Sequence, residues 1–203
     1  EYFSEKLKLF NLNKDNGSSV VMIDDEYGKR IAELNSNVKC ISLKNEDADY
    51  FCTSYSINSF GLAGTLAWDS ETLDFESKLI GSFNLENLIL AASIAIELNI
   101  SAQSIAKGIE NCTNIDGRLH LVENQKNQMI FLDYAHSPDA YFRTLKALEE
   151  NFSRPLKVLF GAGGGRDKSK RPKMAEVVEK YSIECYLAPV SYTHLRAHET
   201  RLN

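Results

Sequence analysis

The sequence predicts an α/β protein, because apolar runs of strand length alternate with amphipathic helical stretches along most of the chain. Residues 18–23 form one such run, and residues 26–34 follow it with apolar side chains on one helical face. Later in the chain, strand candidates at 156–160 and 183–187 flank a helix candidate at 170–181. In this second half of the chain, the alternation of strands and helices implies a mostly parallel sheet.

The first half of the chain contains further strand candidates. Residues 38–43 read as a second strand. Residues 49–76 are rich in Thr, Ser, Tyr, Phe and Gly, and they predict a meander of short strands with turns near Gly61, Gly64 and Asp69.

Two helices are expected next. Residues 84–100 are rich in alanine and place apolar side chains at helical spacing. Ser101 is a good N-cap for a second helix over residues 102–111.

Turn-rich residues at 113–117 predict a domain boundary, with one domain over residues 1–115 and another over residues 116–190. Residues 191–203 break the strand–helix pattern, because they are polar and basic and lack apolar periodicity. Part of this stretch, Ser-Tyr-Thr-His-Leu-Arg-Ala-His-Glu-Thr, resembles the translation of a sequencing adaptor. We therefore expect residues 191–203 to be a non-native tail.

The composition excludes several classes of protein. A formal net charge of -5 argues against a general binder of nucleic acid or anionic membranes. The four cysteines form no CxxC pair, which favours free thiols in a reducing compartment. No apolar run approaches the roughly 18 residues of a membrane span, and no secretory signal is visible. The sequence starts without Met inside a helical pattern, so we expect further residues before it.

Residues 133–139, Asp-Tyr-Ala-His-Ser-Pro-Asp, join an apolar strand to a helix over residues 138–151. Ser137 suits the N-cap and Pro138 the first helical position. A hairpin over 119–123 and 129–132 precedes this segment. One interpretation of these residues is an ordinary capped turn between a strand and a helix. In open α/β sheets, however, ligands bind at the carboxyl ends of the strands, which is where this segment lies.

A second segment has the layout of an anion site. Residues 160–172, Phe-Gly-Ala-Gly-Gly-Gly-Arg-Asp-Lys-Ser-Lys-Arg-Pro, run from a strand through a glycine loop into a helix. The segment lacks the Gly-Lys-Ser/Thr of a P-loop, and Arg166 stands where a dinucleotide fingerprint has its third glycine. By itself, its charge is equally typical of a solvated surface.

A third segment lies near the start. Residues 2–10, Tyr-Phe-Ser-Glu-Lys-Leu-Lys-Leu-Phe, read as an amphipathic helix, and taken alone Lys6 would be a surface lysine.

Together these segments resemble the Mur ligase family, most closely its muramyl-tripeptide ligases (MurE). The resemblance extends to Gly117-Arg118 and to residues 81–87, Gly-Ser-Phe-Asn-Leu-Glu-Asn, and it covers residues 1–187. It implies a truncated central ATPase-like α/β domain over residues 1–115. A partial Rossmann-like C-terminal ligase domain would follow over residues 116–190.

The resemblance also implies roles for individual residues. Lys6 is the candidate carbamylated lysine, an anion that would help to bind Mg²⁺ beside the ATP γ-phosphate. Arg166 would bind a carboxylate of the incoming amino acid, which its planar fork suits. Gly165 stands where the family usually has Asp or a similar residue. The implied ATP contacts, with Asp133 on the ribose, are Asn87, Arg118, Asp133, Tyr134 and His136.

The implied activity is an ATP- and Mg²⁺-dependent amide ligase of peptidoglycan synthesis. It would add meso-diaminopimelate or L-lysine to UDP-N-acetylmuramoyl-L-alanyl-D-glutamate, and the Arg-Asp-x-x-Lys-Arg-Pro pattern favours diaminopimelate. The substrate carboxylate would attack the ATP γ-phosphate, and the added amine would displace phosphate from the acyl phosphate. We expect a cytoplasmic monomer without nucleic-acid or membrane partners.

The P-loop and the UDP-binding domain of the family are not in the sequence, so we expect the 203 residues alone to be inactive. Two alternatives stay open. One is a related ligase of the folylpolyglutamate type. The other is a non-catalytic nucleotide-binding scaffold, which a missing P-loop upstream of Lys6 in the complete gene would indicate.

Overall fold

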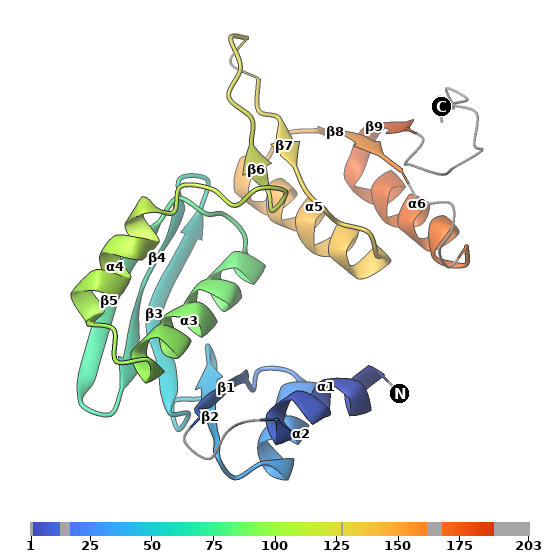
Figure 1. The fold of residues 1–203 in the computed structure, drawn as a ribbon. Coiled ribbons are helices and arrows are strands. Elements are labelled where there is room, and N and C mark those ends of the chain that lie inside the picture. The colour runs from blue at the N-terminus through green and yellow to red at the C-terminus, as the bar shows by residue number, and fades with distance from the viewer. Residues whose placement is uncertain (1, 13–16, 127, 162–167, 189–203) are drawn as a thin grey trace. The chain divides into compact units, whose positions relative to one another are not determined.

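The computed structural model describes residues 2–12, 17–126, 128–161 and 168–188. They form two compact units, one before and one after the step from Thr113 to Asn114 (Figure 1). Both units combine helices with strands, which confirms the predicted α/β class.

The first unit is built on one five-stranded sheet in the order β1-β2-β3-β4-β5. Neighbouring pairs among β1, β2 and β3 are parallel, whereas β3, β4 and β5 form an antiparallel meander (Figure 1). The strands are β1 (Ser19–Met22), β2 (Val38–Ser42), β3 (Tyr50–Asn58), β4 (Gly61–Trp68) and β5 (Glu71–Ser77). The helices are α1 (Tyr2–Asn11), α2 (Glu26–Leu34), α3 (Ser82–Glu97) and α4 (Ala102–Asn111).

Helix α3 supplies much of the first core. Its buried apolar residues recur three or four positions apart, so they form one stripe that packs against the sheet. Leu85 and Ile89 are fully buried in this stripe. Helix α4 starts as predicted, since the Ser101 hydroxyl accepts the Ser104 N–H at 3.3 Å.

Glycines in the meander have different roles. Gly61 directly follows the first hairpin turn and Asp69 lies in the second, as predicted, and both have positive φ. The turn predicted near Gly64 is wrong, because Gly64 lies inside β4 opposite Tyr55. A Cβ there would stand 2.8 Å from the Phe75 ring, so the missing side chain makes room for this ring. The strands are also longer than the predicted short strands.

The described residues of the second unit contain two separate strand pairs. Strands β6 (His120–Leu121) and β7 (Phe131–Leu132) are antiparallel, and β8 (Leu156–Phe160) and β9 (Ser182–Leu187) are parallel. Helices α5 (Pro138–Phe152) and α6 (Lys170–Tyr181) pack together through Tyr141, Leu145, Met174 and Val178. The mostly parallel sheet predicted for this half is therefore only partly correct. Residues 191–203, the predicted tail, lie outside the described residues.

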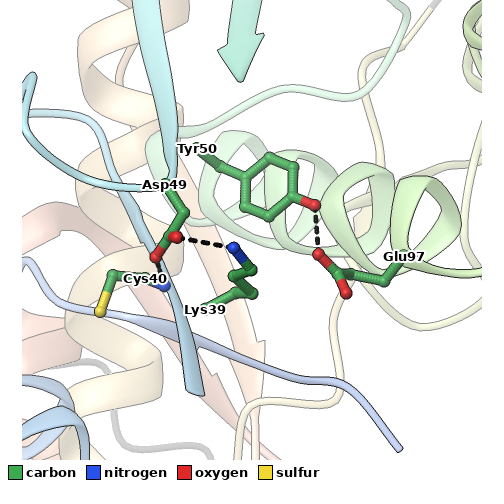
Figure 2. A network of polar contacts seen from close by, with 5 residues as sticks. All are labelled: Lys39, Cys40, Asp49, Tyr50 and Glu97. Atoms are coloured by element: carbon green, nitrogen blue, oxygen red, sulfur yellow. Dashed lines mark hydrogen bonds and ion pairs between the residues drawn. The ribbon is translucent and has the colours of Figure 1, made fainter. Parts of the chain in front are cut away.

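A polar network closes the β2–β3 crossover in the first unit. Figure 2 shows the Asp49 carboxylate accepting the Lys39 ammonium at 3.0 Å and the Cys40 N–H at 2.8 Å. Nearby, the Tyr50 hydroxyl donates to Glu97 at 2.5 Å. Burial raises the pKa of Tyr50, and the hydrogen bond to Glu97 raises it further. The network thus ties the start of β3 to β2 and to the end of α3.

The Asp49 carboxylate is expected to make stability depend on acid pH. Burial raises its pKa, but the bonds from Cys40 and Lys39 outweigh burial and hold the pKa below its ordinary 3.8. The folded state therefore gains stability above pH 3.8 and loses it as the pH falls through the lowered pKa. Because Lys39 and Asp49 are partly exposed, the gain is at most about 1 kcal/mol.

Urea unfolding followed by fluorescence of Trp68, the one tryptophan of the chain, measures this effect. Asp49→Asn should unfold at lower urea than the wild type at pH 7. The difference should shrink as the pH is lowered below about 4. A difference that stays constant over this range would contradict the assignment to Asp49.

The sequence also predicts free cysteines and no membrane-spanning helix. All four cysteines are free thiols, and burial raises the pKa of Cys52 to about 11. Within the described ranges, none of the helices has the length and hydropathy that crossing a bilayer requires.

Candidate functional site

Asp133 is the centre of a hydrogen-bonded loop in the second unit. It follows β7 directly and is half-buried. Its Oδ1 accepts the Ala135 N–H at 2.9 Å and the Thr144 hydroxyl at 3.2 Å. Its Oδ2 accepts the Leu119 N–H at 2.9 Å. One carboxylate therefore joins the end of β7, the start of β6 and helix α5.

The loop around Arg118 is hydrogen-bonded to Asp133 and Tyr134. The Tyr134 N–H donates to the Gly117 carbonyl at 2.7 Å, and the Arg118 N–H donates to the Ile115 carbonyl at 3.0 Å. Gly117 has a φ of 68°, in the left-handed region that favours glycine. Leu119 also has a positive φ, yet its side chain is buried. Arg118 is exposed, and its chain neighbours Gly117 and Leu119 are hydrogen-bonded to Tyr134 and Asp133.

Two aromatic side chains follow Asp133. Tyr134 is 72% exposed, and its ring meets the His136 ring edge-on with centroids 6.0 Å apart. His136 Nδ1 lies 3.1 Å from the Tyr134 carbonyl oxygen. Both rings face solvent, so their surfaces are accessible to a ligand. The structure thus brings together four of the predicted residues: Arg118, Asp133, Tyr134 and His136.

The following helix holds the loop in place. Ser137 is its N-cap, with the hydroxyl accepting the Ala140 N–H at 3.2 Å, and Pro138 occupies the first turn. Both features match the prediction. Strand β7 pairs antiparallel with β6, however, so Asp133 does not follow a strand of a parallel sheet among the described residues.

In the first unit, the two asparagines of the 81–87 segment differ sharply. Asn84 is 2% exposed, and its Nδ2 donates to the Ile80 carbonyl at 2.8 Å, so it holds the entry of α3. Asn87 lies one turn later and is exposed. The predicted ligand contact therefore falls on the accessible asparagine of the pair.

Lys6 lies on α1 with an exposed side chain. Its Nζ stands 5.5 Å from the centre of the Tyr2 ring. Phe3 of α1 contacts α2: its ring centroid lies 5.7 Å from that of Tyr27, and the Arg30 guanidinium lies 4.9 Å from the centre of the same ring. Within the described part of the chain, no three His, Cys, Asp or Glu side chains gather as metal ligands.

Arg166 and most of the glycine loop, residues 162–167, lie outside the described residues. What precedes them is described: the Tyr141 hydroxyl donates to the Gly161 carbonyl at 3.4 Å, and burial raises the pKa of Tyr141. A hollow of about 880 Å³ lies elsewhere, between α4 and the meander. None of the predicted site residues lines it.

Thr144 is the site residue that sequence reasoning missed. It lies 11 residues after Asp133, beside the buried positions Tyr141, Leu145 and Leu148 of α5. A threonine next to a buried helical stripe is a weak signal. Only the folded chain shows that its hydroxyl reaches the Asp133 carboxylate.

Two family profiles match the chain in tandem. The "Mur ligase middle domain" matches residues 1–95, and the "Mur ligase, glutamate ligase domain" matches residues 117–196. The second match begins at the Gly117-Arg118 junction and includes Asp133, and the first includes Lys6 and Asn87.

Similar curated proteins are UDP-N-acetylmuramoyl-L-alanyl-D-glutamate–2,6-diaminopimelate ligases. One from Nostoc sp. is 33% identical over 182 residues, which is 88% of this chain and 37% of that protein. Another, from Fusobacterium nucleatum, is 35% identical over 185 residues, which is 89% of this chain and 37% of that protein. The chain thus spans 37% of the length of these two relatives.

A solved ligase of the same name is 28% identical, with a TM-score of 0.62 over 92% of this chain and 39% of that chain. The folylpolyglutamate synthetase of Lactobacillus casei has a TM-score of 0.72 at 19% identity, over 94% of this chain and 47% of that chain. The latter likeness is one of fold alone. The two profiles and the relatives that align across their junction show that the chain belongs to the Mur ligase family.

Proposed function

We propose that the protein containing this chain is an ATP-dependent ligase of peptidoglycan synthesis that adds meso-diaminopimelate to UDP-N-acetylmuramoyl-L-alanyl-D-glutamate. The observation that carries the proposal is identity of about a third to diaminopimelate ligases across both family regions. L-lysine is the competing amino acid. Folylpolyglutamate synthesis is the competing reaction, for which likeness of fold is the support.

The cluster around Asp133 fits one end of a nucleotide. Tyr134 and His136 offer accessible ring faces, on which a planar base could stack. Arg118 is an exposed cation, and Asp133 is a carboxylate that can accept a ribose hydroxyl. We assign these four residues and Asn87 to ATP. Arg166 we assign to a carboxylate of the incoming amino acid.

The assignment of Mg²⁺ to Lys6 depends on a modification. An ammonium group repels a cation, so Lys6 can help to hold Mg²⁺ only after carbamylation has made it an anion. Its exposed position on α1 leaves the amine accessible for that reaction. When bound, Mg²⁺ would neutralise charge on the transferred phosphoryl group.

The domain assignment accompanies this function. We propose that residues 1–115 belong to the ATP-binding middle domain and residues 116–190 to the ligase domain, with the Gly117-Arg118 junction at the start of the second. We further propose a monomer that works in the cytoplasm.

The test uses the complete gene product that contains this chain. Purified protein is given ATP, Mg²⁺ and UDP-N-acetylmuramoyl-L-alanyl-D-glutamate, with either meso-diaminopimelate or L-lysine. We expect phosphate release and a product whose mass equals the two substrates less one water, with meso-diaminopimelate favoured. Lys6→Ala should lower kcat by at least roughly a hundredfold, with partial recovery in high concentrations of short carboxylates.

Folate with glutamate serves as the control substrate pair. Turnover of that pair without turnover of the UDP-linked substrate would contradict the proposal in favour of the folate reaction. ATP binding without turnover of either pair would favour a nucleotide-binding scaffold.

A further inference from the structure

Donors from the protein itself occupy most of the hydrogen-bond acceptor positions of the Asp133 carboxylate. An ionised carboxylate has about four lone-pair positions, two on each oxygen. Oδ1 accepts two donors, the Ala135 N–H and the Thr144 hydroxyl, while Oδ2 accepts one, the Leu119 N–H. Counting the donors among the described residues, one acceptor position is left, and it is on Oδ2.

We propose that Thr144 is a positioning residue of the nucleotide site: by saturating Oδ1 of Asp133, it leaves Oδ2 to accept a single ribose hydroxyl of ATP. This inference rests on the proposed function, and it deepens that function in two respects. It adds a residue that does not touch the nucleotide, and it limits the carboxylate to one ligand hydroxyl.

The geometry explains why Thr144 matters for orientation. The Ala135 N–H lies two residues from Asp133 and moves with the same loop. Thr144 is on α5, whose buried face packs in the core of the second unit, so its hydroxyl is a fixed reference point. Its bond to Oδ1 therefore opposes rotation of the carboxylate. With that rotation opposed, Oδ2 stays directed at the Leu119 N–H, beside Arg118.

The first experiment uses the complete ligase with ATP, 2′-deoxy-ATP and 3′-deoxy-ATP. A single acceptor predicts that one deoxy analogue has a KM raised about tenfold, while the other behaves like ATP. Equal loss with both analogues would show a carboxylate that holds two hydroxyls. No loss with either would show that Asp133 does not hold the ribose. Either result overturns the proposal.

The second experiment compares Thr144→Val with Thr144→Ser. Valine keeps the shape but removes the donor, so Oδ1 regains a free acceptor position. We expect the valine variant to raise KM for ATP severalfold at nearly constant kcat, and to lose discrimination between the two analogues. Serine keeps the hydroxyl, so Thr144→Ser should have the wild-type KM for ATP and the wild-type discrimination between the two analogues. Lys146→Ala, on the same helix and paired with Glu150 at 3.5 Å, is the control and should match the wild type.

A readout without catalysis separates the two proposals. Amide hydrogen exchange at Ala135 and Leu119 should be faster in Thr144→Val than in Thr144→Ser, because the loop loses its fixed reference. Unchanged exchange, or a serine variant as impaired as valine, overturns the role of Thr144. An active enzyme without analogue preference defeats this inference alone, whereas an enzyme that uses no ATP defeats the proposed function as well.

Discussion

Replacing Asp133 with alanine is expected to loosen the second unit and to remove most of the ligase activity that we propose for the complete protein. Three donors, from Leu119, Ala135 and Thr144, lose their acceptor. Each orphaned donor costs about 1 kcal/mol at a half-buried site, so the total is about 3 kcal/mol. Since the Arg118 junction shifts and the proposed ribose acceptor is lost, kcat/KM of the complete protein for ATP should fall roughly a hundredfold.

Hydrogen exchange at the amides of α5 and of the Gly117–Leu119 junction measures the structural part in the 203-residue chain. Asp139→Ala is the matched control, because Asp139 is a nearby carboxylate in the first turn of α5. Its carboxylate pairs with Arg143 at 3.1 Å on the surface, and such pairs contribute about 1 kcal/mol or less. Equal exchange in the two variants would contradict the central position of Asp133.

Replacing Gly28 with alanine is expected to destabilise the first unit by about 3 kcal/mol or more. Gly28 is buried where α2 crosses β1, and a Cβ there would stand 1.7 Å from the Met22 carbonyl oxygen. That atom is backbone, so the methyl group cannot be accommodated by turning a side chain. Either α2 moves away from β1 or β1 leaves its register with β2.

Gly108→Ala is the matched control for this prediction. Gly108 is also helical, but a Cβ at this position meets nothing within 4 Å. Alanine should therefore stabilise α4 by about 0.5–1 kcal/mol through its better helix propensity. Urea unfolding followed by Trp68 fluorescence compares both variants in the first unit. The clash would be disproved by a Gly28 variant as stable as the wild type.

Helix bounds were largely predictable because their signals are local. Helices α2, α4 and α6 have the bounds predicted from the sequence, and Ser101 caps α4 as predicted. The strands of the meander were less predictable. Gly64 looks like a turn residue in sequence, yet it lies in β4 opposite Phe75, where a Cβ would meet the Ser54 carbonyl oxygen at 2.5 Å and the Phe75 ring at 2.8 Å.

For the site, the order of residue types in 133–139, together with Gly117-Arg118, determined the family from sequence alone. The residues of each segment are adjacent in the chain, so their order can be compared with that of a family directly from the sequence. Only the tertiary structure decided how the Asp133 carboxylate is used. Its partners Leu119 and Thr144 lie 14 and 11 residues away, on opposite sides in the chain. Hydrogen bonds over such separations depend on how β6, β7 and α5 pack, and no periodicity in the sequence encodes that packing.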